Sequence, residues 1–235
     1  MILSGWKNTL LEISNSYSYY KIPVQAVLDA YKEGLFPMAE TANSKEIYWV
    51  EPKKRGVFFF DTIKVPKKLK KIAKTIPFEI SVDLQFEKVI ENCSKLTNTR
   101  KDTWINKTIK LIYVDLFNKG YAHSVECYLN NRLVGGLYGV SIGGVFFGES
   151  MFSFVNNASK FALFHLIERL KVANFDFIDT QFINKHLEQF GALEIPNTNF
   201  KRILKMGIKK DRNFYEFYSK GFLPQKFFPL NNGII

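Results

Sequence analysis

The stretch AHSVECYLNNRLVGGLYGVSIGGVFFGESMFS, residues 122–153, decides the fold class of this 235-residue chain. It contains three runs rich in β-branched, aromatic and other apolar residues, which is typical of strands. The runs are separated by Asn130-Asn131 and by Gly143-Gly144. Two-residue links of this kind suit the positive φ angles of tight hairpin turns. The stretch therefore predicts an antiparallel meander of three strands.

Helical patterns lie on both sides of this meander. Before it, apolar residues recur at helical spacing over 22–31, again after Asp83, where that residue could cap a helix, and again after Thr103. After it, a helix starting near Asn157 leads to FDFIDTQF, residues 175–182, which has the composition of a buried strand. The order predicts an α+β fold with a central mixed sheet in which one strand is reached by a helical crossover. This layout is similar to the acetyltransferase-like (GNAT) fold.

A composition shift near Pro52 to Gly56 predicts a domain boundary. It would separate a small N-terminal domain, residues 1–55, from a GNAT-like catalytic domain, residues 56–235. The smaller unit buries little surface by itself, so we expect it to dock on the larger one.

Composition argues against several classes of protein. Cys93 and Cys127 lie far apart without metal-ligand spacing, which disfavours a zinc site and a disulfide framework. No apolar run approaches the roughly 20 residues that span a bilayer, and the first twenty residues lack an apolar stretch typical of signal peptides. We expect a cytoplasmic, monomeric protein without a membrane partner, a cofactor or a bound metal ion.

The formal net charge of +11 is concentrated in two segments. Clusters of this kind could clamp a phosphate backbone without reading bases. A lysine-rich composition can equally reflect genome bias, so charge alone leaves nucleic-acid binding open. The first cluster holds Lys64, Lys67, Lys68, Lys70, Lys71 and Lys74, and the second holds Lys201, Arg202, Lys205, Lys209, Lys210 and Arg212.

Three polar residues, Glu149, Asp179 and Gln181, stand inside apolar strand-like runs. Asp179 and Gln181 are two apart, so their side chains share one face of a strand. A buried carboxylate and a buried amide must be hydrogen-bonded to be tolerated. The pattern fits a catalytic pair, and it fits a polar strand end near solvent somewhat better.

Several motifs together make the chain resemble one family, the leucyl/phenylalanyl-tRNA–protein transferases. The motifs are GLFPMAE, YWVEPKKRG, TWI, HSVE, LVGGLYG, FFGESMFS, NASK, IDTQ and FGALEIP, in this order between roughly Val24 and Pro196. The resemblance implies transfer of Leu or Phe, and less efficiently Met, from aminoacyl-tRNA to a protein that begins with Lys or Arg. The new N-terminus would mark that protein for degradation by the N-end rule.

The resemblance also implies roles for individual residues. Asp179 would hold and polarise Gln181, which would orient the attacking amine or accept hydrogen-bond character from it. Glu149 would contact the amino group or terminal adenosine of the donor. The donor side chain would enter an apolar pocket, although its residues could equally be ordinary core: Leu137, Met151, Leu163, Leu166, Leu170 and Ile178. The tRNA 3′ end would lie near Trp49, Trp104 and Tyr113, and the tRNA backbone near Arg55, Lys67, Lys68, Lys70 and Lys71.

The chain departs from the family pattern in several places. Met38 stands where many members have Trp, and Asn197 stands where Arg often follows EIP. The run YWVEPKKR stands where the family often carries WWSPDPR, although Trp49 and Arg55 are kept. Other readings remain. A GNAT enzyme using acyl-CoA is disfavoured, because the Q/R-x-x-G-x-G/A pyrophosphate motif is missing. A transferase that builds peptidoglycan bridges usually needs a duplicated fold. A non-catalytic RNA-binding module is supported by charge alone.

Overall fold

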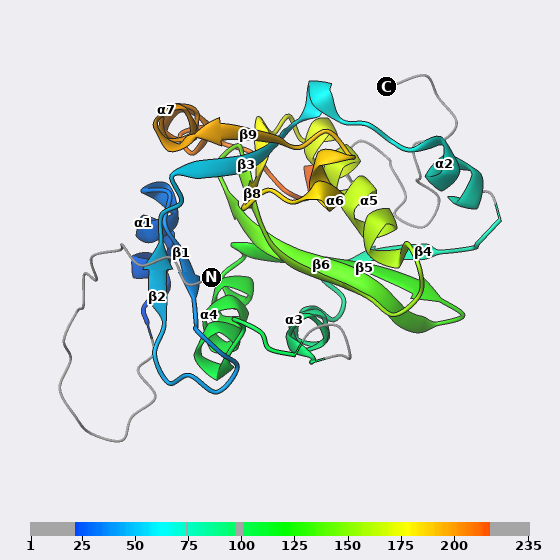
Figure 1. The fold of residues 1–235 in the computed structure, drawn as a ribbon, viewed down its shortest axis with the longest axis horizontal. Coiled ribbons are helices and arrows are strands. Elements are labelled where there is room, and N and C mark those ends of the chain that lie inside the picture. Colours follow the sequence, from blue (N-terminus) through cyan, green and yellow to red (C-terminus); the bar gives the residue numbers. More distant parts are fainter. Residues whose placement is uncertain (1–21, 74, 97–100, 217–235) are drawn as a thin grey trace.

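A seven-stranded mixed sheet in the order β4-β5-β6-β7-β8-β3-β9 organises the computed structural model, which describes residues 22–73, 75–96 and 101–216 (Figure 1). All neighbouring strands are antiparallel except β7 and β8. The predicted α+β class with a mixed sheet is therefore confirmed. The strands are β3 (Lys54–Phe59), β4 (Glu79–Val82), β5 (Ala122–Leu129), β6 (Arg132–Ile142), β7 (Val145–Ser153), β8 (Phe177–Gln181) and β9 (Leu193–Pro196). Residues 1–21 of the predicted N-terminal domain and Lys74 of the first lysine cluster lie outside the described residues.

Helices cover both faces of this sheet, and each face has its own apolar core cluster. Among the described residues, no helix combines the length and the apolar character needed to cross a bilayer. One side, which we call the α4 face, carries α1 (Val24–Lys32), α3 (Phe86–Ser94), α4 (Lys107–Asn118) and α7 (Asn197–Gly207). The other side, the α5 face, carries α2 (Lys67–Ala73), α5 (Ala158–Val172) and α6 (Lys185–Glu188).

The N-terminal part of the described chain adds a separate two-stranded sheet beside α1. It consists of β1 (Phe36–Met38) and β2 (Tyr48–Val50), and a short 3₁₀ helix, η1 (Phe60–Thr62), follows β3. The predicted boundary between residues 55 and 56 falls inside β3, so this strand joins the N-terminal part directly to the main sheet.

The predicted meander is confirmed as β5, β6 and β7. Asn130, Asn131 and Gly143 have φ angles of 51°, 58° and 58°, as their turns require. A glycine in a strand can mark close approach by a ligand or by the protein itself. At Gly139 the approach is internal, because an added Cβ would overlap the carbonyl oxygen of Phe147 and the ring of Phe146.

The start of α3 differs from the prediction that Asp83 caps it. The Glu126 carboxylate accepts hydrogen bonds from the backbone N–H groups of Leu84 (3.1 Å) and Gln85 (3.1 Å), so it serves the N-terminus of α3 from the neighbouring strand β5. Asp83 has a φ of 57° and accepts instead from the backbone N–H of Ser124 at 2.6 Å. The correction arises because a capping carboxylate can come from a distant strand that no local pattern reveals.

The parallel strands β7 and β8 part after a short paired stretch, and the point where they part positions the polar residues of the sheet. The strands pair only as far as Phe147 opposite Asp179, after which β7 continues beside β6 and β8 continues beside β3. On β6, Gly139 pairs with Gly148 and Tyr138 pairs with Ser150, so Glu149 is the extra residue of a β-bulge. The bulge lets Glu149 turn onto the α4 face where the two strands part.

Candidate active site

The Glu149 carboxylate is surrounded by three hydrogen-bond donors from three different elements. Oε1 accepts from the hydroxyl of Tyr31 on α1 at 2.6 Å and from the Gln181 side-chain amide on β8 at 2.9 Å. Oε2 accepts from the hydroxyl of Tyr113 on α4 at 2.6 Å. The two tyrosine oxygens are themselves 2.7 Å apart. The site is thus a half-buried polar cluster on the α4 face, at the point where β7 and β8 part.

A buried ion pair supports this cluster from behind. The Arg55 guanidinium on β3 donates through Nε to Asp179 Oδ1 at 2.8 Å and through a terminal nitrogen to Oδ2 at 2.6 Å. Its other terminal nitrogen donates to the carbonyl of Gly34 at 2.8 Å, and the rings of Phe36 and Phe200 cover its faces at 4.7 and 4.4 Å. Both charged side chains are fully buried. Each of the three guanidinium nitrogens thus makes a hydrogen bond. Bidentate geometry with further hydrogen bonds is the condition under which a buried ion pair is tolerated.

Asp179 acts on Gln181 through the backbone. Its Oδ1 accepts from the backbone N–H of Gln181 at 2.8 Å, whereas the Gln181 side chain contacts Glu149. Asp179 thus holds Gln181, as predicted, but through the backbone N–H. Polarisation of the side-chain amide stays a prediction. Gln181 has a φ of 63°, which is uncommon for a residue with a side chain and carries a strain of about 1–3 kcal/mol. The Asp179 contact holds that backbone in place, and Gln181 thereby reaches Glu149.

Burial dominates the electrostatics of the cluster. It raises the pKa of Glu149 to about 7, against the opposing effect of the hydrogen bonds from Tyr113, Tyr31 and Gln181. Burial, with the charge of Glu149 adding to it, also raises the pKa of Tyr31 and Tyr113 well above the usual range. Both hydroxyls therefore stay protonated and available as donors, while the carboxyl can gain or lose a proton near neutral pH.

Two residues assigned to tRNA contacts by the resemblance do not fit those roles here. Arg55 is fully buried and its guanidinium is occupied by Asp179 and Gly34, so it has no exposed nitrogen for a phosphate. Tyr113 is fully buried as well, and no face of its ring is open for a base to stack on. The physical reason is the same in both cases, since each side chain completes a buried polar network.

The other predicted tRNA residues are accessible. Trp49 and Trp104 are half-buried and lie on either side of β1, because Trp49 pairs with Pro37 and the carbonyl of Trp104 accepts from the backbone N–H of Ala39 at 3.2 Å. Their role at the tRNA 3′ end stays a prediction. The α2 lysines also stay a prediction for backbone contact; Lys67, Lys68 and Lys71 are exposed and Lys70 is half-buried.

The six predicted pocket residues all pack on the α5 face, on the opposite side of the sheet from the Glu149 cluster. Five of them are at most 4% exposed, and only Met151, which follows Glu149 on β7, is half-buried. In this structure they form continuous core, so a donor side chain would have to displace them to enter. Their role as the donor pocket stays a prediction.

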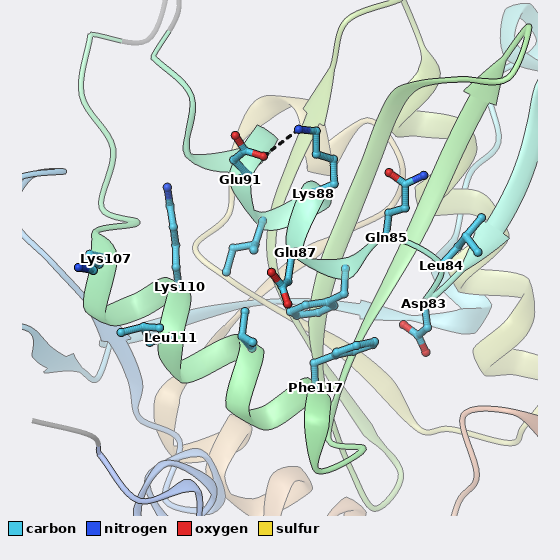
Figure 2. Close-up of a pocket in the computed structure, with 13 residues that line it drawn as sticks. Asp83, Leu84, Gln85, Glu87, Lys88, Glu91, Lys107, Lys110, Leu111 and Phe117 are labelled. Carbon is cyan, nitrogen blue, oxygen red and sulfur yellow. Dashed lines mark ion pairs between the residues drawn. The ribbon is translucent and has the colours of Figure 1, made fainter. Parts of the chain in front are cut away.

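A hollow of about 720 Å³ lies elsewhere, between α3 and α4 (Figure 2). Lys107, Lys110 and Leu111 line it from α4, and the ion pair of Lys88 with Glu91, at 3.1 Å, lines it from α3. None of the predicted site residues is among its lining residues. The hollow is therefore separate from the Glu149 cluster.

Sequence reasoning missed Tyr31 as a site residue. Tyr31 is the last member of the apolar stripe of α1, and such a stripe normally indicates core packing. Its hydroxyl donates a hydrogen bond to Glu149, which lies 118 positions later in the sequence. The one available signal was its place three residues before the GLFPMAE motif.

Comparisons with known proteins all indicate one family. A family model described as leucyl/phenylalanyl-tRNA protein transferase matches residues 57–205, and a model of the N-terminal domain of that transferase matches residues 21–53. A leucyl/phenylalanyl-tRNA–protein transferase of Zymomonas mobilis is 50% identical over 182 residues, which cover 77% of this chain and 68% of that protein. One of Caulobacter vibrioides is 44% identical over 192 residues, which cover 82% of this chain and 88% of that protein. The chain belongs to the leucyl/phenylalanyl-tRNA–protein transferase family of aminoacyltransferases.

Proposed function

We propose that this enzyme moves Leu or Phe, and less efficiently Met, from aminoacyl-tRNA to the N-terminal Lys or Arg of an acceptor protein. The product would begin with a residue that marks it for degradation by the N-end rule. We further propose that it does so as a cytoplasmic monomer on a GNAT-like fold. The opening of a parallel strand pair at the candidate site supports that fold assignment.

The observation that carries the proposal is the contact between Glu149 and Gln181 at the point where β7 and β8 part. The reaction is an aminolysis, in which the acceptor amine attacks the ester carbonyl of the donor and the ribose oxygen leaves. An ester is already activated, so positioning and charge stabilisation can supply most of the rate. A carboxylate and an amide held rigidly beside an opening are suited to orient an amine for this attack.

Transfer of a labelled amino acid tests the proposal directly. Purified protein is incubated with labelled Leu-tRNA, Phe-tRNA or Met-tRNA, one at a time, and with a peptide that begins with Arg. We expect label on the peptide with all three donors, weakest with Met, and none on a matched peptide that begins with Ala. No label from any donor would refute the function.

Two glutamine variants separate chemistry from binding. Gln181→Ala removes the amide at the opening, and we expect it to slow transfer at least about tenfold while tRNA affinity stays unchanged. Gln189→Ala, at an exposed position beyond α6, is the matched control and should change neither quantity. An equal loss of transfer in both variants would contradict the role of Gln181.

A further inference from the structure

We infer that Glu149 takes the proton of the attacking amine, and that Tyr31 and Tyr113 are positioning residues that hold its carboxylate for this step. The inference deepens the proposed function and rests on it, because it assigns the proton transfer within the same aminolysis. It gives Glu149 a role different from the donor contact that the family resemblance implies.

The geometry leaves room for the amine on Glu149. An ionised carboxylate has about four acceptor positions, two on each oxygen. Oε1 already accepts from Tyr31 and Gln181, whereas Oε2 accepts only from Tyr113 among the described residues. One acceptor position therefore remains on Oε2. Glu149 is half-buried rather than enclosed, and it lies at the opening between β7 and β8.

The number of hydrogen atoms in the cluster also favours protonation of Glu149. Tyr31, Tyr113 and Glu149 form a ring of three oxygen contacts of 2.6, 2.6 and 2.7 Å. The two hydroxyls supply two hydrogens, so an ionised Glu149 leaves one of the three contacts without a hydrogen. When Glu149 is protonated, it donates to one tyrosine, that tyrosine donates to the other, and the second donates back to the carboxyl. The ring is complete only after Glu149 has gained a proton.

Asp179, the other carboxylate near Gln181, is unsuited to this task. Its Oδ1 accepts from Arg55 and from the Gln181 backbone, and its Oδ2 accepts from Arg55. It is fully buried against that cation. A fully buried carboxylate is not accessible to an incoming amine, so Asp179 does not meet the acceptor nitrogen in this structure.

The step balances in atoms and charge. The acceptor nitrogen forms a bond to the ester carbon, and the carbonyl electron pair moves onto its oxygen. Glu149 takes the proton that the nitrogen loses. Collapse of the tetrahedral intermediate breaks the bond to the ribose oxygen, and that oxygen receives the proton from Glu149. Glu149 returns to its ionised form, with Gln181 holding the amine in line.

The titratable groups around Glu149 come from every element packed on it. They are Tyr31 on α1, Tyr113 on α4, Tyr138 on β6, and Asp179 on β8 with its partner Arg55 on β3. Burial raises the pKa of Glu149, and the hydrogen bonds from Tyr31 and Tyr113 lower it. Removing the hydroxyls of Tyr31 and Tyr113 should therefore raise the pKa of Glu149 further. A higher pH would then be needed before Glu149 is ionised and can accept a proton.

The test compares Y31F/Y113F with Y138F. Tyr138 is an ideal matched control, because it is fully buried against Tyr113 with ring centroids 5.1 Å apart, yet its hydroxyl bonds no described residue. The maximal rate of transfer from Leu-tRNA to an Arg-initiated peptide is measured between about pH 5.5 and 9. We expect the rising limb of Y31F/Y113F to shift upward by about one pH unit, which lowers the rate on that limb about tenfold. The profile of Y138F should coincide with that of the unmodified protein.

The acceptor amine also titrates in this range, but it is the same in all reactions, so a shift between variants reports on the enzyme. A Y31F/Y113F profile that coincides with the unmodified one would overturn the inference, and so would an equal shift in Y138F. If the double variant does not fold, Y31F and Y113F are measured singly, with a smaller upward shift expected from each and no shift overturning the inference. Absence of transfer by the unmodified protein would instead refute the proposed function.

Discussion

Removing the buried Arg55 guanidinium should lower the unfolding free energy of this protein far more than removing the exposed ammonium of the adjacent Lys54. In Arg55→Ala the buried Asp179 carboxylate loses both bonds to the cation and keeps only the Gln181 backbone N–H. Leaving one member of a buried ion pair without its partner costs about 3–5 kcal/mol of unfolding free energy. A chain of this size loses roughly 2–4 °C of Tm per kcal/mol, so Tm should fall by about 6–20 °C.

Lys54→Ala provides the matched control from the adjacent position. Lys54 pairs with Glu194 at 2.8 Å, but 69% of its side chain is exposed, and water and salt screen such a pair. Urea unfolding, together with a thermal scan, gives the two free energies under one set of conditions. If Arg55→Ala loses no more stability than Lys54→Ala, the argument that this buried pair supports the site is refuted.

Three further outcomes can be checked on the same material. Leu166→Ala and Ile167→Ala should each lower the unfolding free energy by about 2–5 kcal/mol. Only Leu166→Ala should change the ratio of Leu to Phe transferred, and a change of that ratio in both variants would contradict the pocket assignment. Gly139→Ala should lose about 1–3 kcal/mol through overlap with the next strand, whereas Gly148→Ala, whose nearest contact is 3.5 Å away, should lose less in the same urea titration. The pKa of Glu149 is raised from about 4.5 to about 7, so its stabilising contribution is complete below about pH 4.5 and is lost as the pH rises through about 7. Relative to E149Q, the unmodified protein should lose on the order of 3 kcal/mol across that window, and parallel curves for the two proteins would contradict the raised pKa.

The parts of the fold that local pattern determines were predictable from the sequence. The meander follows from strand composition and from Asn130-Asn131, whose backbone must turn through positive φ. Helix α4 follows from apolar spacing, and the Asn106 side chain caps it by accepting from the backbone N–H of Ile109 at 2.8 Å. Each of these signals is complete within a dozen residues, so no distant partner is needed to recognise it.

The candidate site depends on contacts between distant parts of the chain, and these were less predictable. Glu149, Asp179 and Gln181 could be recognised as candidate site residues because they are polar within apolar strands. The sequence did not indicate which of their side chains would hydrogen-bond to one another. Arg55 stands in the run KKRG, which has the composition of an exposed basic loop, and its partner lies 124 positions away. Local composition cannot distinguish a cation that faces water from one that faces a distant carboxylate.

The strand β3 has a consequence for any attempt to divide this protein. It is the partner of both β8 and β9, and it begins with the residues that link the two stretches matched by the family models. A fragment starting at residue 56 would lack the cation that neutralises Asp179 and the first two residues that pair with β9. A fragment ending at residue 55 would carry that cation into water without its counter-ion. The regions matched by the two family models should therefore be expressed together as one chain. Fragments divided at β3 should be insoluble.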